Sequence, residues 1–264
     1  MAVARGGFTL GDIHCDEGDA LYCALEDNPR RLQSRLTKLC GMPPWNAQRL
    51  DFFCELPRLA EGGLAVLEDW IKSKPHPRLI VIDVLAMVRP QQKQKDQSAY
   101  DADYTAVLQL RELASKHGIA IIVICHLRKA DADDAFDTVS GTLGLTGAPD
   151  SVLVLKRDST GTFVLHGRGR DLIEIEKAMD FDSDKCTWRI IGDAGSMRRS
   201  SERQAVLDAI AEADEPIGPA DIAAATRMRP TNVRYLLSRL VKDGAIEKVG
   251  YGRYRRKFEE SAEV

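Results

Sequence analysis

Short apolar runs recur along the first three quarters of the chain, and helical patterns separate them. The runs that we predict to be strands of an α/β sheet are Asp19–Leu25, Asp51–Cys54, Arg78–Val84, Ile119–Cys125 and Ser151–Lys156. A β-ribbon is predicted to follow, with strands at Thr162–His166, Leu172–Ala178 and Thr187–Ile191. Strands that alternate with helices are typical of a parallel sheet with crossover helices. The pattern therefore predicts an α/β body.

Two helical patterns lie within this body. Asn28 and Pro29 are typical of a helix start, and three leucines then recur at helical spacing until Gly41. A longer helix is predicted from about Asp101 to His117, directly before the fourth strand. Residues 90–98 show no periodicity and predict a surface loop.

The pattern changes beyond residue 195, where helices are no longer separated by strands. We predict helices over 205–213, Pro219–Thr226 and Pro230–Val241, followed by two short strands about a Gly-Tyr-Gly turn. Three helices and a β-hairpin in this order resemble a winged helix-turn-helix. The predicted organisation is a body at 1–195, a linker at 196–201, a winged helix-turn-helix at 202–257 and an acidic tail at 258–264.

Charge is divided unevenly along the chain. The 264 residues carry 37 Lys and Arg against 40 Asp and Glu, a net charge of −3. Residues 198–257 hold thirteen Lys and Arg but only eight Asp and Glu, so this module is basic and the body is acidic. A small basic module on an acidic body indicates a nucleic-acid partner.

Composition excludes several classes of protein. A chain that is 44% hydrophobic and 29% charged is globular, neither disordered nor collagen-like. The longest apolar run, Ile119–Cys125, is too short for a membrane helix, and the N-terminus has no apolar signal-peptide core. The six cysteines form no CxxC pair, so we expect reduced core residues rather than a zinc site. We therefore expect a cytoplasmic protein with no membrane partner.

Polar side chains follow three of the predicted strands. Asp83 ends the apolar run at 79–82, which is how a buried strand presents a carboxylate to Mg²⁺ in nucleotide hydrolases. Glu26 and Asp27 follow the first strand, where a carboxylate polarises an attacking water or, alternatively, begins the next helix. His126 follows the fourth strand, as a polar sensing group or as a histidine satisfied at a strand end.

Taken in order, these pieces resemble the RecA-like ATPase core of the RepA and DnaB type of hexameric replicative helicase, above all plasmid and phage RepA-like proteins. The segments that carry the resemblance are Leu21–Leu32, Arg78–Asp83, Ile121–Lys129, Ser140–Asp150 and Gly169–Asp171. The resemblance implies a RecA-like P-loop NTPase core of the AAA type, with ATP and Mg²⁺ as cofactors. It also implies a homo-oligomer, a hexameric ring in the family.

The resemblance also assigns roles by position. Glu26 corresponds to the catalytic glutamate, Asp83 to the metal-binding carboxylate and His126 to the sensor of the terminal phosphate. Arg170 corresponds to the arginine finger that reaches a neighbouring subunit's site. The further candidates for nucleotide binding are Asp27, Arg168 and Lys129. Without the resemblance, Arg168 and Arg170 would be a solvated basic strand.

The phosphate-binding loop of this family is missing from the sequence. Family members begin with a strand, then GxxxxGK[S/T], then a helix, because backbone N–H groups, a lysine and a hydroxyl cradle the phosphates. No such motif occurs here, and residues 1–12 look like the end of the helix that follows it. The missing strand lies between the strands at 119–125 and 151–156, so either these two close up or apolar edges stay exposed.

The third helix of the C-terminal module is the candidate recognition helix. Four apolar residues form its inner face, which turns the remaining side chains outward. The candidate DNA-binding residues are Thr231, Asn232, Arg234, Tyr235 and Arg239 on this helix and Arg253 and Arg255 on the hairpin. A protein-docking module with a solvated surface is the alternative, and the positive charge favours DNA.

Two functions from different classes fit these observations. The first is the ATPase subunit of a RepA- or DnaB-like replicative DNA helicase, or of a related plasmid or phage replication protein. The alternative is a catalytically inactive DNA-binding replication or regulatory protein, in which the RecA-like body is an oligomerisation scaffold. An upstream in-frame GxxxxGK[S/T] would favour the enzyme.

Overall fold

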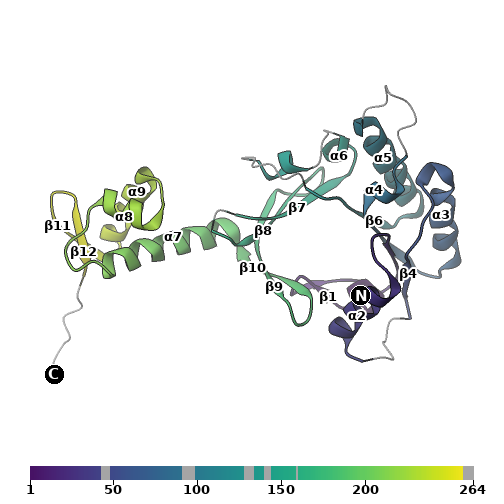
Figure 1. The fold of residues 1–264 in the computed structure, drawn as a ribbon, viewed down its shortest axis with the longest axis horizontal. Helices are drawn as coiled ribbons and strands as arrows, with labels where there is room; N and C mark the ends of the chain where they lie inside the picture. Colours follow the sequence, from purple (N-terminus) through teal and green to yellow (C-terminus); the bar gives the residue numbers. More distant parts are fainter. Residues whose placement is uncertain (43–47, 91–98, 128–133, 140–143, 159, 258–264) are drawn as a thin grey trace. The chain divides into compact units, whose positions relative to one another are not determined.

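The chain divides into two compact units, Met1–Gly192 and Asp193–Val264. Figure 1 shows the elements of a computed structural model, coloured along the sequence. The structure describes residues 1–42, 48–90, 99–127, 134–139, 144–158 and 160–257. Each unit has a hydrophobic core of its own, and each is described here by itself.

The first unit contains a parallel sheet with the strand order β4-β3-β5-β6. Its strands are β3 (Asp19–Ala24), β4 (Leu50–Phe53), β5 (Pro77–Asp83) and β6 (Ala120–Ile124). Every neighbouring pair is parallel, as crossover connections require. The α/β body and these four strands are therefore confirmed.

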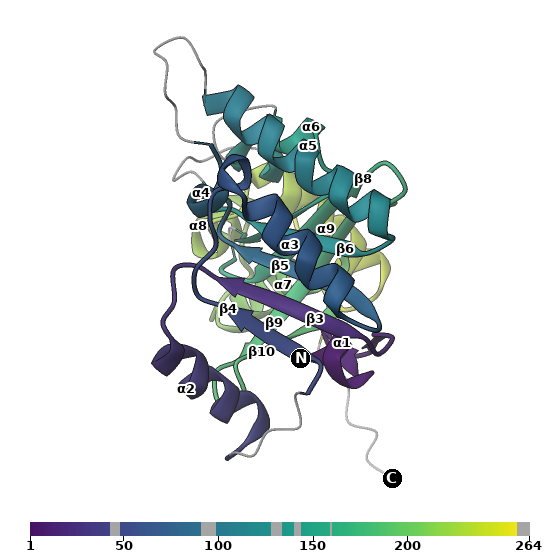
Figure 2. The same ribbon diagram turned by 90° about the vertical axis from the view of Figure 1, so that its right-hand side faces the viewer.

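Two helices, α3 (Gly63–Ser73) and α5 (Ala99–His117), cover one face of this sheet (Figure 2). Leu67 of α3 and Leu110 of α5 are buried in one core with Ile80 and Ile82 of β5. The sequence analysis predicted α5 but missed α3. The residue that precedes α3, Gly62, has φ 104° and offers no capping side chain, so the usual start signal is absent.

The helix after β3 is α2 (Pro29–Cys40), close to its predicted range. Asn28 caps it, because its side chain accepts a hydrogen bond from the Arg31 N–H at 3.0 Å. At the start of the chain, α1 (Ala2–Arg5) ends at Gly6, which adopts a left-handed conformation with φ 61°. A short helix end was predicted there. The hairpin of β1 (Phe8–Thr9) and β2 (Ile13–His14) was not.

A second sheet is antiparallel, with the order β10-β9-β8-β7. Its strands are β7 (Ser151–Arg157), β8 (Phe163–Gly169), β9 (Ile175–Asp182) and β10 (Thr187–Asp193). The last three correspond to the predicted ribbon. The placement of β7 in the parallel sheet was wrong, because it pairs antiparallel with β8 along its whole length.

Strands β6 and β7 do not close up: within the described residues they belong to different sheets. The second expectation was an exposed strand edge, and within the described residues β6 is indeed the last strand of its sheet. Apolar side chains next to this edge are exposed as well. Ile122 and Ile124 of β6 are 51% and 36% exposed, and Leu153 of β7 is 61% exposed. Parallel strands are normally covered on both faces, so the surface around Ile122 and Ile124 is an incomplete layer of this fold.

Four short elements complete the first unit. They are η1 (Leu59–Glu61), α4 (Leu85–Val88), η2 (Ala135–Thr138) and α6 (Gly144–Gly147). The predicted loop at residues 90–98 falls almost wholly outside the described part of the chain. In the part that is described, we find no helix long and apolar enough to cross a membrane.

The second unit has three helices and a hairpin. They are α7 (Ala194–Ala211), α8 (Pro219–Thr226), α9 (Pro230–Lys242), β11 (Ile246–Gly250) and β12 (Arg253–Arg256). The predicted linker, residues 196–201, is helical and lies inside α7. This helix begins earlier than expected because Asp193 caps it, accepting a hydrogen bond from the Ser196 N–H at 2.9 Å.

The cysteines are all free, as expected. Cys23 is buried in the sheet, and this burial raises the pKa of its thiol to about 12. Cys125 packs against the same core. The prediction of core positions was wrong for Cys15, Cys40, Cys54 and Cys186, which are half-buried and belong to no hydrophobic core of the described residues.

The hydrophobic core of the second unit allows a prediction of how a substitution changes its unfolding free energy. Leu237 is fully buried between α7, α8 and the hairpin, with 0% exposure. Leu237→Ala removes three heavy atoms from this core and leaves a cavity, so we expect the unit to lose about 2–5 kcal/mol of unfolding free energy. Urea denaturation followed by circular dichroism measures this loss.

A matched control lies on the same helix. Val241 is 37% exposed, so Val241→Ala is expected to cost less than about 1 kcal/mol. Equal losses from the two substitutions would contradict the packing of α9.

Candidate functional site

Asp83 lies at the C-terminal end of β5, on the sheet face that carries the exposed β6 side chains. In the register of the sheet it is opposite Ala24 of β3 and Ile124 of β6. The Tyr22 hydroxyl donates a hydrogen bond of 2.6 Å to Oδ2 of Asp83. Partial burial, and after it this hydrogen bond, raise the pKa of Tyr22 well above its usual value. Tyr22 therefore remains a donor that orients the Asp83 carboxylate.

Tyr22 is a site residue that the sequence analysis missed. Side chains two residues apart on a strand share a face, so Tyr22 and Ala24 point to the same side of β3. Since Ala24 is in register with Asp83, a tyrosine two residues before it is within reach of that carboxylate. Predicting the contact between Tyr22 and Asp83 requires the register of β3 against β5, and the sequence does not give this register.

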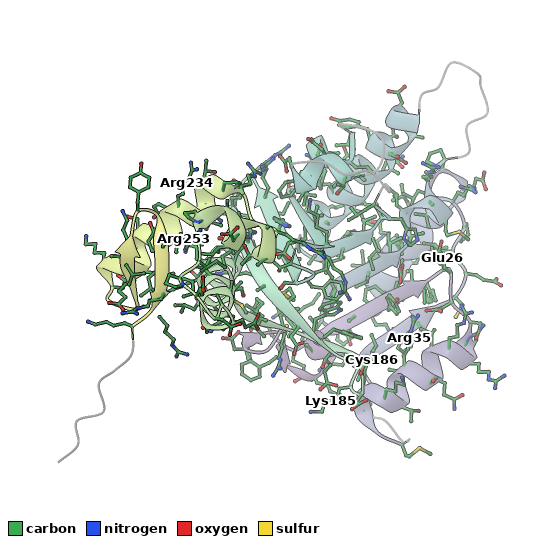
Figure 3. The ribbon with its side chains drawn as sticks, turned by 60° about the vertical axis from the view of Figure 1, so that its left-hand side comes forward. Glu26, Arg35, Lys185, Cys186, Arg234 and Arg253 are labelled. Atoms are coloured by element: carbon green, nitrogen blue, oxygen red, sulfur yellow. The ribbon has the colours of Figure 1, made fainter. Side chains whose placement is uncertain are left out.

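The ends of three strands bring the predicted catalytic residues to one edge. The N–H of Leu25 donates to the carbonyl oxygen of Asp83 at 2.8 Å, which places Glu26 directly beside the end of β5. From the end of β6, Nε2 of His126 lies 3.5 Å from Oε2 of Glu26. The side chains of Glu26 and His126 are 49% and 77% exposed, so both are accessible to a ligand. Figure 3 labels Glu26 at this edge.

Within the described residues, the structure gives no contact that supports nucleotide binding by the two further candidates, Asp27 and Lys129. Asp27 forms ion pairs with Arg31, at 3.8 Å, and with Arg35. These contacts tie it to α2, as expected for a carboxylate that begins a helix. Lys129, together with Arg128, lies outside the described residues. For both Asp27 and Lys129, nucleotide binding stays a prediction.

The donor atoms at this edge fit Mg²⁺ held together with phosphate. Mg²⁺ prefers oxygen ligands, and in nucleotide enzymes it uses one or two carboxylates beside phosphate oxygens and water. Asp83 and Glu26 supply such carboxylates. No group of three or more His, Cys, Asp or Glu that could hold a metal ion occurs in the described residues. The oxygen donors at this edge therefore fit a Mg²⁺ that arrives with a nucleotide, and Asp83 as its ligand stays a prediction.

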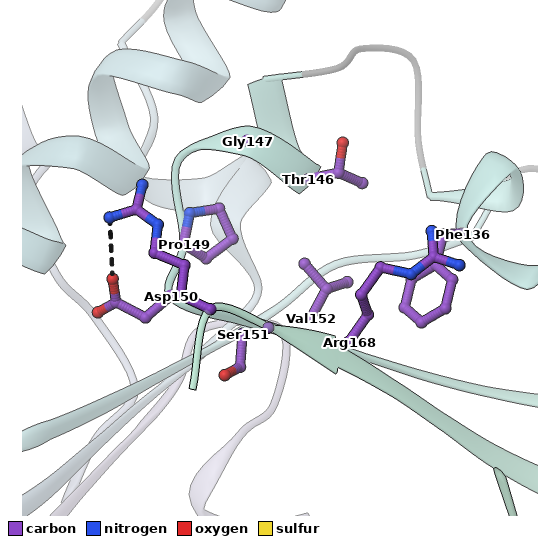
Figure 4. Close-up of a pocket in the computed structure, with 10 residues that line it drawn as sticks. Phe136, Thr146, Gly147, Pro149, Asp150, Ser151, Val152 and Arg168 are labelled. Atoms are coloured by element: carbon purple, nitrogen blue, oxygen red, sulfur yellow. Dashed lines mark ion pairs between the residues drawn. The ribbon is translucent and has the colours of Figure 1, made fainter. Parts of the chain in front are cut away.

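Arg168, near the end of β8, is held within its own unit. Its guanidinium donates to Glu174 at 2.9 Å and to Asp134 at 3.4 Å, and it lies 4.3 Å from the ring centroid of Phe136 (Figure 4). The bond to Glu174 is the largest cause that raises the pKa of Arg168. These contacts position the Arg168 side chain, which remains 52% exposed to solvent.

Arg170 is freer than Arg168. Among the described residues it forms one ion pair, between Nη1 and Oδ1 of Asp150 at 3.7 Å, and its side chain is 61% exposed. Both arginines border a cavity of about 230 Å³. Its other lining side chains include Phe136, Thr146, Pro149 and Val152. An exposed arginine with one long ion pair is able to reach outward, which the finger role requires.

In the second unit, α9 presents its predicted outward face. Thr231, Arg234, Tyr235 and Arg239 are exposed, and Tyr235 has 57% of its surface accessible. The Arg239 guanidinium lies 5.4 Å from the centre of the Tyr235 ring, a cation–π distance. Figure 3 labels Arg234 on this helix. The face therefore combines charged and aromatic donors suited to a nucleic acid.

Asn232 does not point outward as predicted. It is half-buried, and its Nδ2 donates to Oε2 of Glu202 on α7 at 3.0 Å. The helical pattern alone missed this because the packing of α7 against α9 was not known. This bond engages Nδ2 and holds the side chain toward α7, so a DNA contact through that group competes with Glu202.

The two hairpin arginines are partly engaged. Arg253 lies 3.6 Å from Asp221 and donates to the carbonyl oxygen of Pro216 at 3.3 Å. Arg255 pairs with Glu247, its neighbour across the hairpin. Both ion pairs are exposed and therefore weak, so either guanidinium can exchange its carboxylate for a phosphate.

Comparison with known families agrees with the division of the chain into an α/β unit and a helix-turn-helix unit. A family model described as an AAA domain matches residues 1–132, which include Glu26, Asp83 and His126. A model described as the IclR helix-turn-helix domain matches residues 205–250, which include α8 and α9. The comparison with curated proteins found no match. The chain belongs to the AAA domain family and combines this ATPase-type domain with a C-terminal helix-turn-helix.

Proposed function

We propose that the protein is the ATPase subunit of a RepA- or DnaB-like replicative DNA helicase, or of a related plasmid or phage replication protein. The observation that carries the proposal is the edge of the parallel sheet where Glu26 follows β3 beside the end of β5, which carries Asp83. At this edge Nε2 of His126 lies 3.5 Å from Oε2 of Glu26. The AAA domain accounts for nucleotide binding and the helix-turn-helix for DNA binding. The proposal assigns residues 1–195 to the ATPase body and residues 202–257 to a winged helix-turn-helix.

Each residue at the edge has a definite task in ATP hydrolysis. Bound Mg²⁺ would offset the charge on the phosphates, and Asp83, oriented by Tyr22, would hold it. Glu26 accepts a hydrogen bond from the attacking water and so aligns and polarises it. His126, exposed at the next strand end, donates to the terminal phosphate and signals its presence.

The arginine finger predicts complementation between subunits. In a form that carries the phosphate-binding loop upstream, Arg170→Ala and Glu26→Gln should each remove most ATPase activity. Mixed oligomers should recover part of it, because some interfaces pair an intact arginine with an intact glutamate. Phosphate release by verified mixed oligomers measures the recovery. No recovery would place both residues in one subunit's site or outside catalysis.

The alternative is a catalytically inactive DNA-binding protein that keeps the body as an oligomerisation scaffold. Two observations favour it: the sequence has no GxxxxGK[S/T], and Ile122 beside the site is 51% exposed. Such a protein would bind DNA through the second unit, and this binding would not require a nucleotide.

One experiment separates the two functions. The helicase predicts that a forked duplex is unwound only when ATP and Mg²⁺ are present. The scaffold predicts that the same fork is bound equally with or without nucleotide and is never unwound. A fluorescence-quenched fork reports unwinding, and anisotropy of the same fork reports binding. Binding without unwinding in the loop-bearing form would overturn the helicase.

A further inference from the structure

Helix α2 presents a concentrated positive charge to solvent in the first unit. Four of its twelve residues are Arg or Lys, and none is Asp or Glu. Leu32 and Leu36 are buried, and the side opposite to them is centred on the exposed Ser34. The exposed residues Arg30, Arg31, Ser34, Arg35 and Lys38 are called the α2 basic face.

Little of this charge is neutralised within the unit. Asp27 is the partner of both Arg31 and Arg35, so one carboxylate serves two guanidinium groups. Among the described residues, Arg30 and Lys38 have no ion-pair partner. Residues 1–197 carry 24 Lys and Arg against 29 Asp and Glu, so the face stands out from an acidic body. Repulsion within such a face is relieved when a polyanion binds it.

The dimensions of the α2 basic face fit a nucleic-acid backbone. Arg30 and Lys38 are eight residues apart, which is about 12 Å along a helix. That distance covers about three phosphates of one DNA strand. Ser34 lies between them with the exposed Gln33 beside it, and hydroxyl and amide groups are common donors to phosphate oxygens.

An anionic membrane surface fits this helix less well. Helices that lie on membranes expose an apolar face with large aromatic or leucine side chains. In α2, Leu32 and Leu36 are buried in the unit, Leu39 alone of its leucines is exposed, at 38%, and the helix has no aromatic residue. The exposed face therefore offers charge and hydrogen bonds, with little apolar surface to insert.

We propose that the α2 basic face is a second DNA-binding surface, which contacts the phosphate backbone without reading bases. It is separate from the helix-turn-helix, and it gives the ATPase-type unit a DNA contact of its own. The proposal requires neither ATP hydrolysis nor DNA binding by α9. A non-specific contact of this kind is dominated by counterion release and is therefore sensitive to salt.

Site-directed crosslinking in the full chain tests the proposal. A photoreactive benzoylphenylalanine at Ser34 lies at the centre of the face, and the same residue at Ser115 lies on an exposed turn of α5. Both are introduced together with Arg234→Ala and Arg239→Ala, which remove the outward arginines of α9. We expect the probe at 34 to crosslink a labelled duplex and the probe at 115 to give background only. Equal yields at the two positions would overturn the proposal.

Charge removal provides an independent measurement. Arg30→Gln with Lys38→Gln should lower the slope of log affinity against log salt by about two units, because two phosphate contacts are lost. The control pair, Lys72→Gln with Lys116→Gln, removes equal charge from the Glu68 cluster on α3 and α5 and should leave the slope unchanged. An unchanged slope in the α2 variant overturns the proposal, as does retention on anionic phosphatidylserine vesicles without DNA crosslinking.

Discussion

Arg234→Ala combined with Arg239→Ala is expected to weaken duplex DNA binding by the second unit about a hundredfold. Both arginines lie on the exposed face of α9, and neither has an ion-pair partner among the described residues. Each guanidinium is therefore free to bind a base edge or a phosphate, and such contacts contribute about 1–3 kcal/mol each. Fluorescence anisotropy of a labelled duplex, titrated at several salt concentrations, measures the loss.

The salt dependence separates the roles of helix and hairpin. Arg255→Ala should weaken binding to all sequences alike and flatten the salt slope by about one unit, as expected for one phosphate contact. Arg234→Ala should instead reduce the preference for a selected duplex over a random one. Asn232→Ala should alter stability as well as binding, because it removes the bond to Glu202. Duplex binding that none of these changes affects would favour a protein-docking role for the unit.

The strands of the parallel sheet could be predicted because apolar runs and turn residues are local signals. Each of β3, β4, β5 and β6 is a short β-rich run, and three of them end beside the polar residues of the site. Their alignment at one edge follows from parallel pairing, since the carboxyl ends of parallel strands lie together. Proximity of Glu26, Asp83 and His126 was therefore predictable from the sequence.

What could not be predicted depends on contacts between distant segments. The strand character of β7 was evident, but its sheet was decided by pairing with β8, which antiparallel register fixes over seven residue pairs. Helix α3 lacks a capping side chain, so the spacing of Leu67 and Trp70 is its main local signal. Tyr22 and the Asn232–Glu202 bond each join two elements, so neither has a local signature.

The exposed apolar face of β6 lies beside the candidate site and affects how strongly its carboxylates can act. Ile124 is in register with Asp83, so the uncovered apolar layer borders the site itself. A carboxylate beside an uncovered face is more hydrated than one in a closed pocket, and its effect on phosphate and water is weaker. Within the described residues, Glu26, Asp83 and His126 thus lie at an edge that is open to solvent, without the enclosure that would strengthen the catalytic roles proposed for them.

The 264-residue chain alone is therefore expected to bind ATP-Mg²⁺ poorly and to hydrolyse it at close to the background rate. Asp83 and Glu26 place metal and water, but they do not replace the backbone N–H groups and lysine that hold the phosphates. Isothermal titration with ATP and Mg²⁺, together with a phosphate-release assay, checks both statements. Submicromolar affinity for ATP in this chain would show that other residues supply the cradle.

In a form that carries the phosphate-binding loop, Glu26→Gln is expected to lower turnover by at least about a hundredfold while ATP affinity stays within a few-fold. The reason is that the amide keeps the size of Glu26 but loses the negative charge that polarises water. Asp83→Asn should differ, weakening Mg²⁺-dependent ATP binding as well, because the metal loses its carboxylate. Glu61→Gln, an exposed change in η1, serves as the control and should alter neither quantity. If Glu26→Gln lowered affinity and turnover equally, Glu26 would be a structural residue that begins the segment before α2, and the water would have to be activated elsewhere.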